Sequence, residues 1–143
     1  MELEFNKIFE NFNETIVNLE APFSDARGYI QPLVDASMRS AVLIFSKKGT
    51  VRANHFHKTD WHYCYVLSGS IDYYQRPAGS NDRPSHVIIK TGQLFYTPPL
   101  VEHAMVFLED TEFLCLGGNP RDQKSYESDV IRVDLVNQGS CIA

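Results

Sequence analysis

The chain has 143 residues, of which 43% are hydrophobic, and this suits one globular domain with a full core over residues 1–143. The net charge is -5 and the basic residues form no stripe, so we expect no nucleic-acid partner. No apolar run approaches the roughly 20 residues that span a bilayer, and the acidic N-terminus lacks an apolar signal region. We therefore expect a cytoplasmic protein without a membrane partner.

Short runs rich in valine, isoleucine, tyrosine and phenylalanine alternate with turn signals, which is typical of β-strands. No segment after the first dozen residues has a helical period. Many short strands at this spacing indicate a sandwich or barrel, for which a double-sheet jelly roll is one solution. The first 20 residues could form an arm that pairs with the sheet of a second subunit. We predict strands at 15–19, 28–34, 39–46, 51–57, 62–67, 70–75, 86–90, 94–97, 104–108, 112–116 and 129–135.

The three cysteines form no CxxC pair, and their odd number argues against a disulfide framework. Cys64 and Cys115 lie within apolar strand patterns, whereas Cys141 lies near the C-terminus. We predict free buried thiols in a reducing compartment.

Four of the five histidines fall into one pattern. His55 and His57 alternate in a predicted strand and project from the same face. His62 begins the next strand, and His103 starts a later one, whereas His86 lies in a polar segment where we expect surface exposure. Single histidines in strands are usually surface or hydrogen-bonded core residues, but imidazole is also the commonest ligand for borderline metals. Together, the four predict one divalent transition metal ion (Zn, Fe, Ni, Cu or Mn) inside a β-barrel.

The spacing of glycines, histidines and a proline in the middle third of the chain resembles the two cupin motifs. The matching residues are Gly49, His55, His57, Gly69, Gly92, Pro98 and His103. His62 stands where the family usually has a glutamate, and Leu100 and Phe107 replace a glycine and an asparagine. The resemblance implies an all-β cupin fold, a double-stranded β-helix (jelly roll) barrel, with a metal bound by these histidines. The missing carboxylate should weaken hard ions such as manganese relative to zinc, copper, nickel or ferrous iron.

A narrower resemblance lies within the cupins. The segment from Phe23 to Tyr29, which contains Asp25, Arg27 and Gly28, is similar to a signature of dTDP-4-dehydrorhamnose 3,5-epimerases. Residues 52–58 and 126–132 resemble segments of dTDP-sugar 3,4-ketoisomerases. The resemblance implies an isomerase or epimerase acting on a sugar or nucleotide sugar.

In those families, arginines matching Arg27 and Arg52 bind the phosphates or the sugar, a role that suits the guanidinium fork. The histidine that matches His55 is the base that removes a proton next to a ketone, and a tyrosine returns a proton on the opposite face. The sequence does not choose among the available tyrosines, which are Tyr63, Tyr65, Tyr73, Tyr74 and Tyr96.

The two resemblances conflict at His55. A metal-bound imidazole cannot also be a free base, because its lone pair is occupied. The catalytic residues therefore stay unassigned. Three classes of function remain: a metal-assisted sugar isomerase or epimerase, a metal-dependent dioxygenase, and a non-catalytic module that binds a small molecule. Cupins of this size resemble one another in forming dimers, so we also expect a homodimer.

Overall fold

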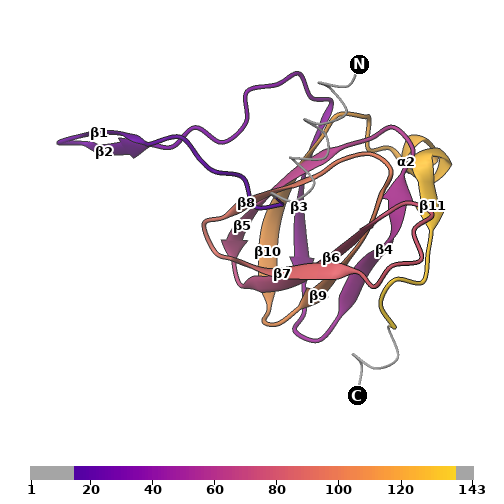
Figure 1. The fold of residues 1–143 in the computed structure, drawn as a ribbon. Coiled ribbons are helices and arrows are strands. Elements are labelled where there is room, and N and C mark those ends of the chain that lie inside the picture. The colour runs from indigo at the N-terminus through magenta and orange to yellow at the C-terminus, as the bar shows by residue number, and fades with distance from the viewer. Residues whose placement is uncertain (1–14, 138–143) are drawn as a thin grey trace.

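The computed structural model describes residues 15–137, which form two antiparallel sheets facing each other around a common interior (Figure 1). The first sheet has the order β3-β10-β5-β8 and the second the order β11-β4-β9-β6-β7. The strands of the first are β3 (Ser40–Ser46), β10 (Thr111–Gly117), β5 (His62–Ser68) and β8 (Leu94–Thr97). The strands of the second are β11 (Val130–Arg132), β4 (Val51–His57), β9 (Val101–Phe107), β6 (Ser70–Pro77) and β7 (Ser85–Lys90). This arrangement confirms the predicted all-β jelly roll.

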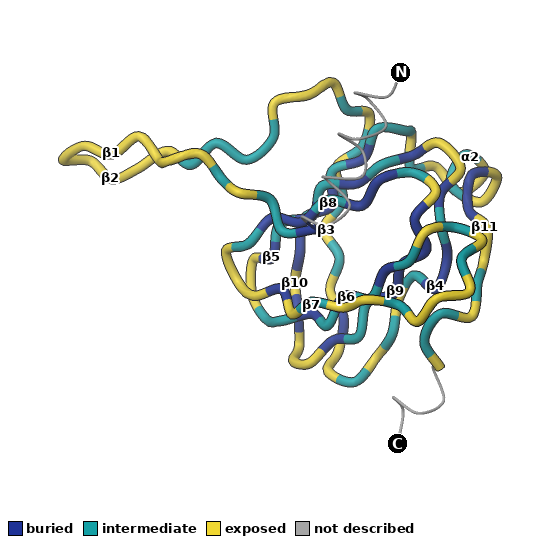
Figure 2. Tube along the Cα trace, viewed as in Figure 1, coloured by how far each residue is buried: buried dark blue, intermediate teal, exposed yellow. Residues whose placement is uncertain are grey.

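The core lies between the sheets because apolar side chains recur at every second position of the strands. In β6, Ile71 and Tyr73 are fully buried, while Asp72 between them is half-buried. Phe107 and Phe113 stack from opposite sheets with ring centroids 5.9 Å apart. Figure 2 shows the buried stretches lining the barrel wall. The strands that carry the histidines are therefore held in place by a packed core.

Several elements differ from the prediction. The strand predicted at 129–135 is shortened to β11, and the strand predicted at 104–108 begins earlier, as β9. Residues 15–19 form only an isolated bridge from Ile16 to Phe95 of β8, and the rest of the predicted arm lies mainly outside the described residues. The predicted strand 28–34 is shortened to β2 (Gly28–Ile30), paired with the unpredicted β1 (Phe23–Asp25). A helix, α2 (Gln123–Asp129), also escaped prediction, because its seven residues are too few to display a helical period. The Asp122 side chain accepts a hydrogen bond from the backbone N–H of Ser125 and caps this helix.

The β1–β2 hairpin projects away from the barrel (Figures 1 and 2). Its large apolar side chains Phe23, Tyr29 and Ile30 are each at least 70% exposed. Strand β3, at the edge of the first sheet, exposes Leu43 and Phe45. Within residues 15–137, no helix has the length and apolarity needed to cross a bilayer.

Candidate metal centre and cavity

A β-bulge sets the orientation of the first two histidines. The pairing of β4 with β9 shifts register between Ala53 and His55, where Ala53 and Asn54 adopt positive φ angles of 72° and 54°. Asparagine tolerates this conformation, and its side chain exchanges two hydrogen bonds with the backbone of Val136, at 3.0 and 2.9 Å. After the bulge, His55 lies opposite His103 of β9 and both are buried. The bulge therefore sets the register that pairs the two histidines across the sheet.

Three of the predicted ligands form what we call the three-histidine centre: His55, His57 and His103. They offer ligand nitrogens that all lie within 4.8 Å of one another, and all three side chains are buried. A histidine nitrogen binds zinc at about 2.0–2.1 Å, so nitrogens around one ion are at most about 4.2 Å apart. Small side-chain rotations would bring the three nitrogens to that spacing.

Burial keeps this centre uncharged at neutral pH. Desolvation, helped by the neighbouring imidazoles, lowers the pKa of His55 to about 2 and that of His57 to about 4. The pKa of His103 falls to about 3, mainly through burial. Its Nδ1 lies 3.1 Å from the carbonyl oxygen of Val101, which can only accept, so Nδ1 carries the proton and Nε2 keeps its lone pair. Neutral imidazoles with free lone pairs are the form that binds metals.

His57 provides the observation that best fits a bound ion. It is 1% exposed, and neither ring nitrogen has a hydrogen-bond partner. A carboxylate oxygen of Asp129 lies 3.3 Å from its Nδ1 but does not make a hydrogen bond. Leaving a buried polar group unsatisfied costs about 1–3 kcal/mol. Coordination of an ion would satisfy one of these nitrogens.

The fourth predicted ligand, His62, is held differently. Its Nε2 lies 2.9 Å from a carboxylate oxygen of Asp60, and its ring centroid lies 4.6 Å from that of His57. Burial lowers the pKa of His62, but the hydrogen bond to Asp60 and the interaction with Cys115 together outweigh it and raise the pKa to about 9. His62 groups with His57 and Asp60, whereas His55 and His103 belong to the other set. It would bind a shared ion only through Nδ1 and after losing its proton, so a fourth ligand stays a prediction.

A cavity of about 190 Å³ lies against this centre. Two of the three histidines, His55 and His103, reach its wall together with His62, and most of the remaining lining is apolar. The other lining residues are Ile44, Arg52, Ala53, Cys64, Phe95, Thr97, Met105, Phe113, Cys115, Arg121 and Tyr126.

Two of the polar residues on the cavity wall were not predicted. Arg121 places its guanidinium carbon 4.0 Å from the ring centroid of Tyr126, and that ring lies 6.1 Å from the ring of His55. Among the described cavity-lining residues, Tyr126 is the only tyrosine, and it is not one of the five tyrosines considered from sequence. Tyr73 is buried and hydrogen-bonded to Thr97 instead. The signal that could have found Tyr126 is its position at the start of the segment that resembles ketoisomerases.

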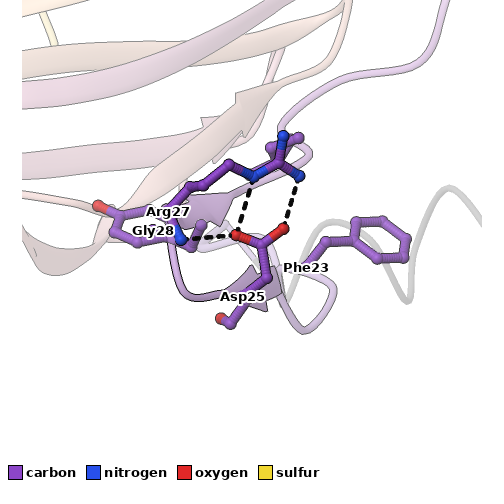
Figure 3. A pocket seen from close by; sticks show the side chains of 7 residues that line it. Phe23, Asp25, Arg27 and Gly28 are labelled. Atoms are coloured by element: carbon purple, nitrogen blue, oxygen red, sulfur yellow. Dashed lines mark hydrogen bonds and ion pairs between the residues drawn. The ribbon is translucent and has the colours of Figure 1, made fainter.

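The two predicted substrate-binding arginines lie in different places. Arg52 lines the cavity, and its guanidinium donates to Ser46 Oγ at 2.6 Å and to the Phe45 carbonyl at 3.0 Å. Arg27 lies on the projecting hairpin, where its exposed side chain pairs with Asp25 at 2.7 Å (Figure 3). The hollow in Figure 3 is lined by hairpin residues alone. The structure therefore brings Arg52 to the cavity but not Arg27.

A family model described as the cupin domain matches residues 42–117, which are more than half of the chain and include all four predicted ligands. The chain belongs to the cupin family. No match was found among curated proteins.

Solved structures of similar fold include two 3,4-ketoisomerases and a 3,5-epimerase. A QdtA 3,4-ketoisomerase from Thermoanaerobacterium thermosaccharolyticum, in complex with TDP, is 23% identical, with a TM-score of 0.65 and 89% of each chain covered. A 3,4-ketoisomerase from Helicobacter canadensis is 17% identical, with a TM-score of 0.65, covering 82% of this cupin and 88% of that chain. A dTDP-4-dehydrorhamnose 3,5-epimerase from Sulfolobus tokodaii is 16% identical, with a TM-score of 0.63 and coverages of 86% and 85%. At these identities the likeness establishes the fold.

Proposed function

We propose that this cupin is an isomerase or epimerase that moves a proton on the carbon next to the carbonyl of a sugar derivative. The observation that carries the proposal is the cavity itself, in which His55 and His62 share one wall with the phenol of Tyr126 and the guanidinium of Arg121. Such a reaction requires groups that accept and donate protons and a cationic environment for the oxygen on which negative charge develops. Tyr126 and His62 supply the donors, and Arg121 supplies positive charge, in one small volume.

We further propose that the three-histidine centre holds one divalent transition metal ion. When bound, the ion would polarise a substrate oxygen and stabilise negative charge on it. With a pKa of about 2, a free His55 would be a weak base, because general bases work best with a pKa near the operating pH. The low pKa therefore favours the role of metal ligand for His55 over the role of catalytic base.

Tyr126 and His62 would then act as the proton donor and the hydrogen-bond donor to the substrate. Burial raises the pKa of the Tyr126 hydroxyl, which keeps it protonated and able to donate a proton to the substrate. With its pKa raised to about 9, His62 carries a proton at neutral pH and can donate a hydrogen bond to an oxygen bearing negative charge. Asp60 holds the His62 ring by accepting from its Nε2.

The size of the cavity and the solved structures of similar fold support the proposed substrate class. Pockets for drug-sized ligands usually exceed about 300 Å³, so about 190 Å³ suits a single sugar ring but not a whole nucleotide sugar. QdtA was crystallised with TDP-4-keto-6-deoxyglucose. We propose that a nucleotide part would lie outside the cavity, near Arg52, which also lines a surface hollow with Lys47 and Thr50. Guanidinium and ammonium groups suit a diphosphate.

Exchange of substrate hydrogen with solvent tests this function. In D2O, metal-loaded protein should incorporate deuterium next to the keto group of TDP-4-keto-6-deoxyglucose, as followed by proton NMR. We expect Y126F to slow the exchange about 100-fold, since a positioned acid typically contributes 10²–10⁴-fold. Tyr65, which does not line the cavity, provides the matched control Y65F, expected to leave the rate unchanged. Tight binding of the sugar nucleotide without any exchange would instead indicate a non-catalytic binding module.

A metal-dependent dioxygenase is the second candidate. It is favoured by the neutral three-histidine centre, which leaves coordination positions open, and by the apolar wall formed by Phe95, Met105 and Phe113. Consumption of oxygen by the ferrous protein, measured with an oxygen electrode and lost in H103A, would support this candidate. Absence of deuterium exchange in the same preparation would decide against the isomerase.

We also propose a homodimer. Leu43, Phe45 and Leu67 are exposed on the first sheet, and large apolar side chains exposed on one sheet are a candidate interaction surface. The hairpin could then carry Arg27 towards the cavity of the second copy. Light scattering should give twice the chain mass for the native protein, and about the chain mass for L43K/F45K. A native monomer would remove both the dimer and this role for Arg27.

A further inference from the structure

Two cysteines lie opposite each other on adjacent strands of the first sheet. Cys64 in β5 and Cys115 in β10 are direct register partners in the antiparallel pairing of these strands. Residues directly opposite in such a pair project from the same face of the sheet. Both cysteines line the cavity, both are free, and they are only 3% and 4% exposed. The sheet therefore presents a pair of thiols to the interior of the barrel.

The geometry of this pair suits a disulfide. Cα atoms of directly opposed antiparallel residues are about 4.5–5.5 Å apart, within the 4.4–6.8 Å that a disulfide spans. A bond between the two thiols joins strands that are already neighbours, so neither strand has to move to a new position.

We propose that Cys64 and Cys115 form a reversible oxidation site, in which a small hydroperoxide-class oxidant that enters the cavity converts the two thiols to a disulfide. One thiol, as its thiolate, attacks a peroxide oxygen; the O–O bond breaks, and hydroxide leaves. The sulfur of the second cysteine then attacks the resulting sulfenic acid, the S–O bond breaks, and water leaves with the second thiol proton. The thiols lose two electrons, and hydrogen peroxide is reduced to two molecules of water.

The cavity also determines which oxidants react. Because the thiols open only onto about 190 Å³, hydrogen peroxide can reach them, whereas a bulky disulfide such as oxidised glutathione cannot approach a sulfur in line. We expect oxidised glutathione to act at least about tenfold more slowly than hydrogen peroxide on the folded protein. This site goes beyond the proposed sugar chemistry and does not depend on it.

Trypsin separates the cysteines cleanly, which makes the bond easy to detect. Trypsin cleaves after lysine and arginine but not before proline, so Arg76 and Arg83, which each precede a proline, stay uncut. Cys64 therefore lies in the peptide 59–90, Cys115 in 91–121 and Cys141 in 133–143. Folded protein is treated with hydrogen peroxide, its free thiols are alkylated, and the digest is analysed by mass spectrometry without reductant. We expect a linked 59–90/91–121 species, lighter by two hydrogen atoms than the sum of the peptides and lost on reduction of the digest.

Three variants make the result decisive. C141S should give the linked species as readily as the native chain, because Cys141 is not part of the pair. C64S and C115S should give none, and the remaining cavity cysteine should accumulate sulfenic or sulfinic acid. The proposal is overturned if native protein keeps both thiols alkylatable while urea-unfolded protein becomes linked. It is also overturned if peptide 133–143 is joined as often as the cavity pair.

Discussion

In the presence of a chelator, the three-histidine centre should make the free energy of unfolding fall by about 3–4 kcal/mol per pH unit between about pH 6 and about pH 4.5. The cause is the three-histidine centre, whose pKa values are lowered from 6.5 to about 2, 4 and 3 for His55, His57 and His103. In this range the three imidazoles bind about three protons in the unfolded chain, whereas the same imidazoles stay neutral in the folded chain. Each proton is worth about 1.4 kcal/mol per pH unit.

The sign follows from the direction of the shifts. Because the folded pKa values are depressed, the stabilisation is fully present above pH 6.5 and is lost as the pH falls towards the folded values. His62 behaves in the opposite way. Its pKa is raised to about 9, so its contribution is complete below pH 6.5 and is lost only as the pH rises through about 9. It therefore adds little to the acid slope.

Urea unfolding followed by circular dichroism at several pH values measures this slope. H57Q removes one of the three imidazoles that become protonated only on unfolding. It should therefore reduce the slope by about a third, or about 1.4 kcal/mol per pH unit. H86Q is the matched control, because the His86 side chain is 55% exposed and pairs with Asp72 away from the centre, as expected from its polar segment. A native slope below about 1 kcal/mol per pH unit would show that these imidazoles are not held neutral.

The second large effect concerns the metal. We expect native protein to bind one divalent transition metal ion with near-stoichiometric occupancy, and H57A and H103A each to weaken binding at least about 100-fold, since each loses a direct ligand. Elemental analysis gives the occupancy, and calorimetric titration with zinc or cobalt(II) gives the affinity. H86A replaces an exposed histidine and should bind like the native chain.

His62 can be classified in the same titration. If it is a fourth ligand, H62A should lose affinity as strongly as H103A, and H62A/H103A should lose all metal. If it acts only through its bond to Asp60, the affinity of H62A should stay within about tenfold of the native value. Full metal content in both H57A and H103A would refute the three-histidine centre, whatever H62A shows.

Much of the barrel could be predicted from local patterns. Alternation of apolar residues predicts β4, β5, β6 and β10 nearly to their ends. This is possible because successive side chains of a strand point to opposite faces, so the two-residue period is visible in the strand's own sequence. The same period, with the cupin spacing, placed His55 and His57 on one face, and the structure adds His103 from a distant strand. The free, buried state of Cys64 and Cys115 was also predicted correctly.

Other features depend on contacts between distant parts of the chain. Only the pairing of β4 with β9 creates the bulge at Ala53 and Asn54. The loop that holds Asp60 beside His62 is fixed by Asp129, which accepts a hydrogen bond from the backbone N–H of Asp60 at 3.0 Å. The register of β5 on β10 sets Cys64 against Cys115, and the fold brings Tyr126 to the cavity from a helix too short to show a period. The local sequence pattern of a strand shows which face each residue occupies. The partner of that residue on the neighbouring strand depends on the pairing register between segments that are tens of residues apart in sequence.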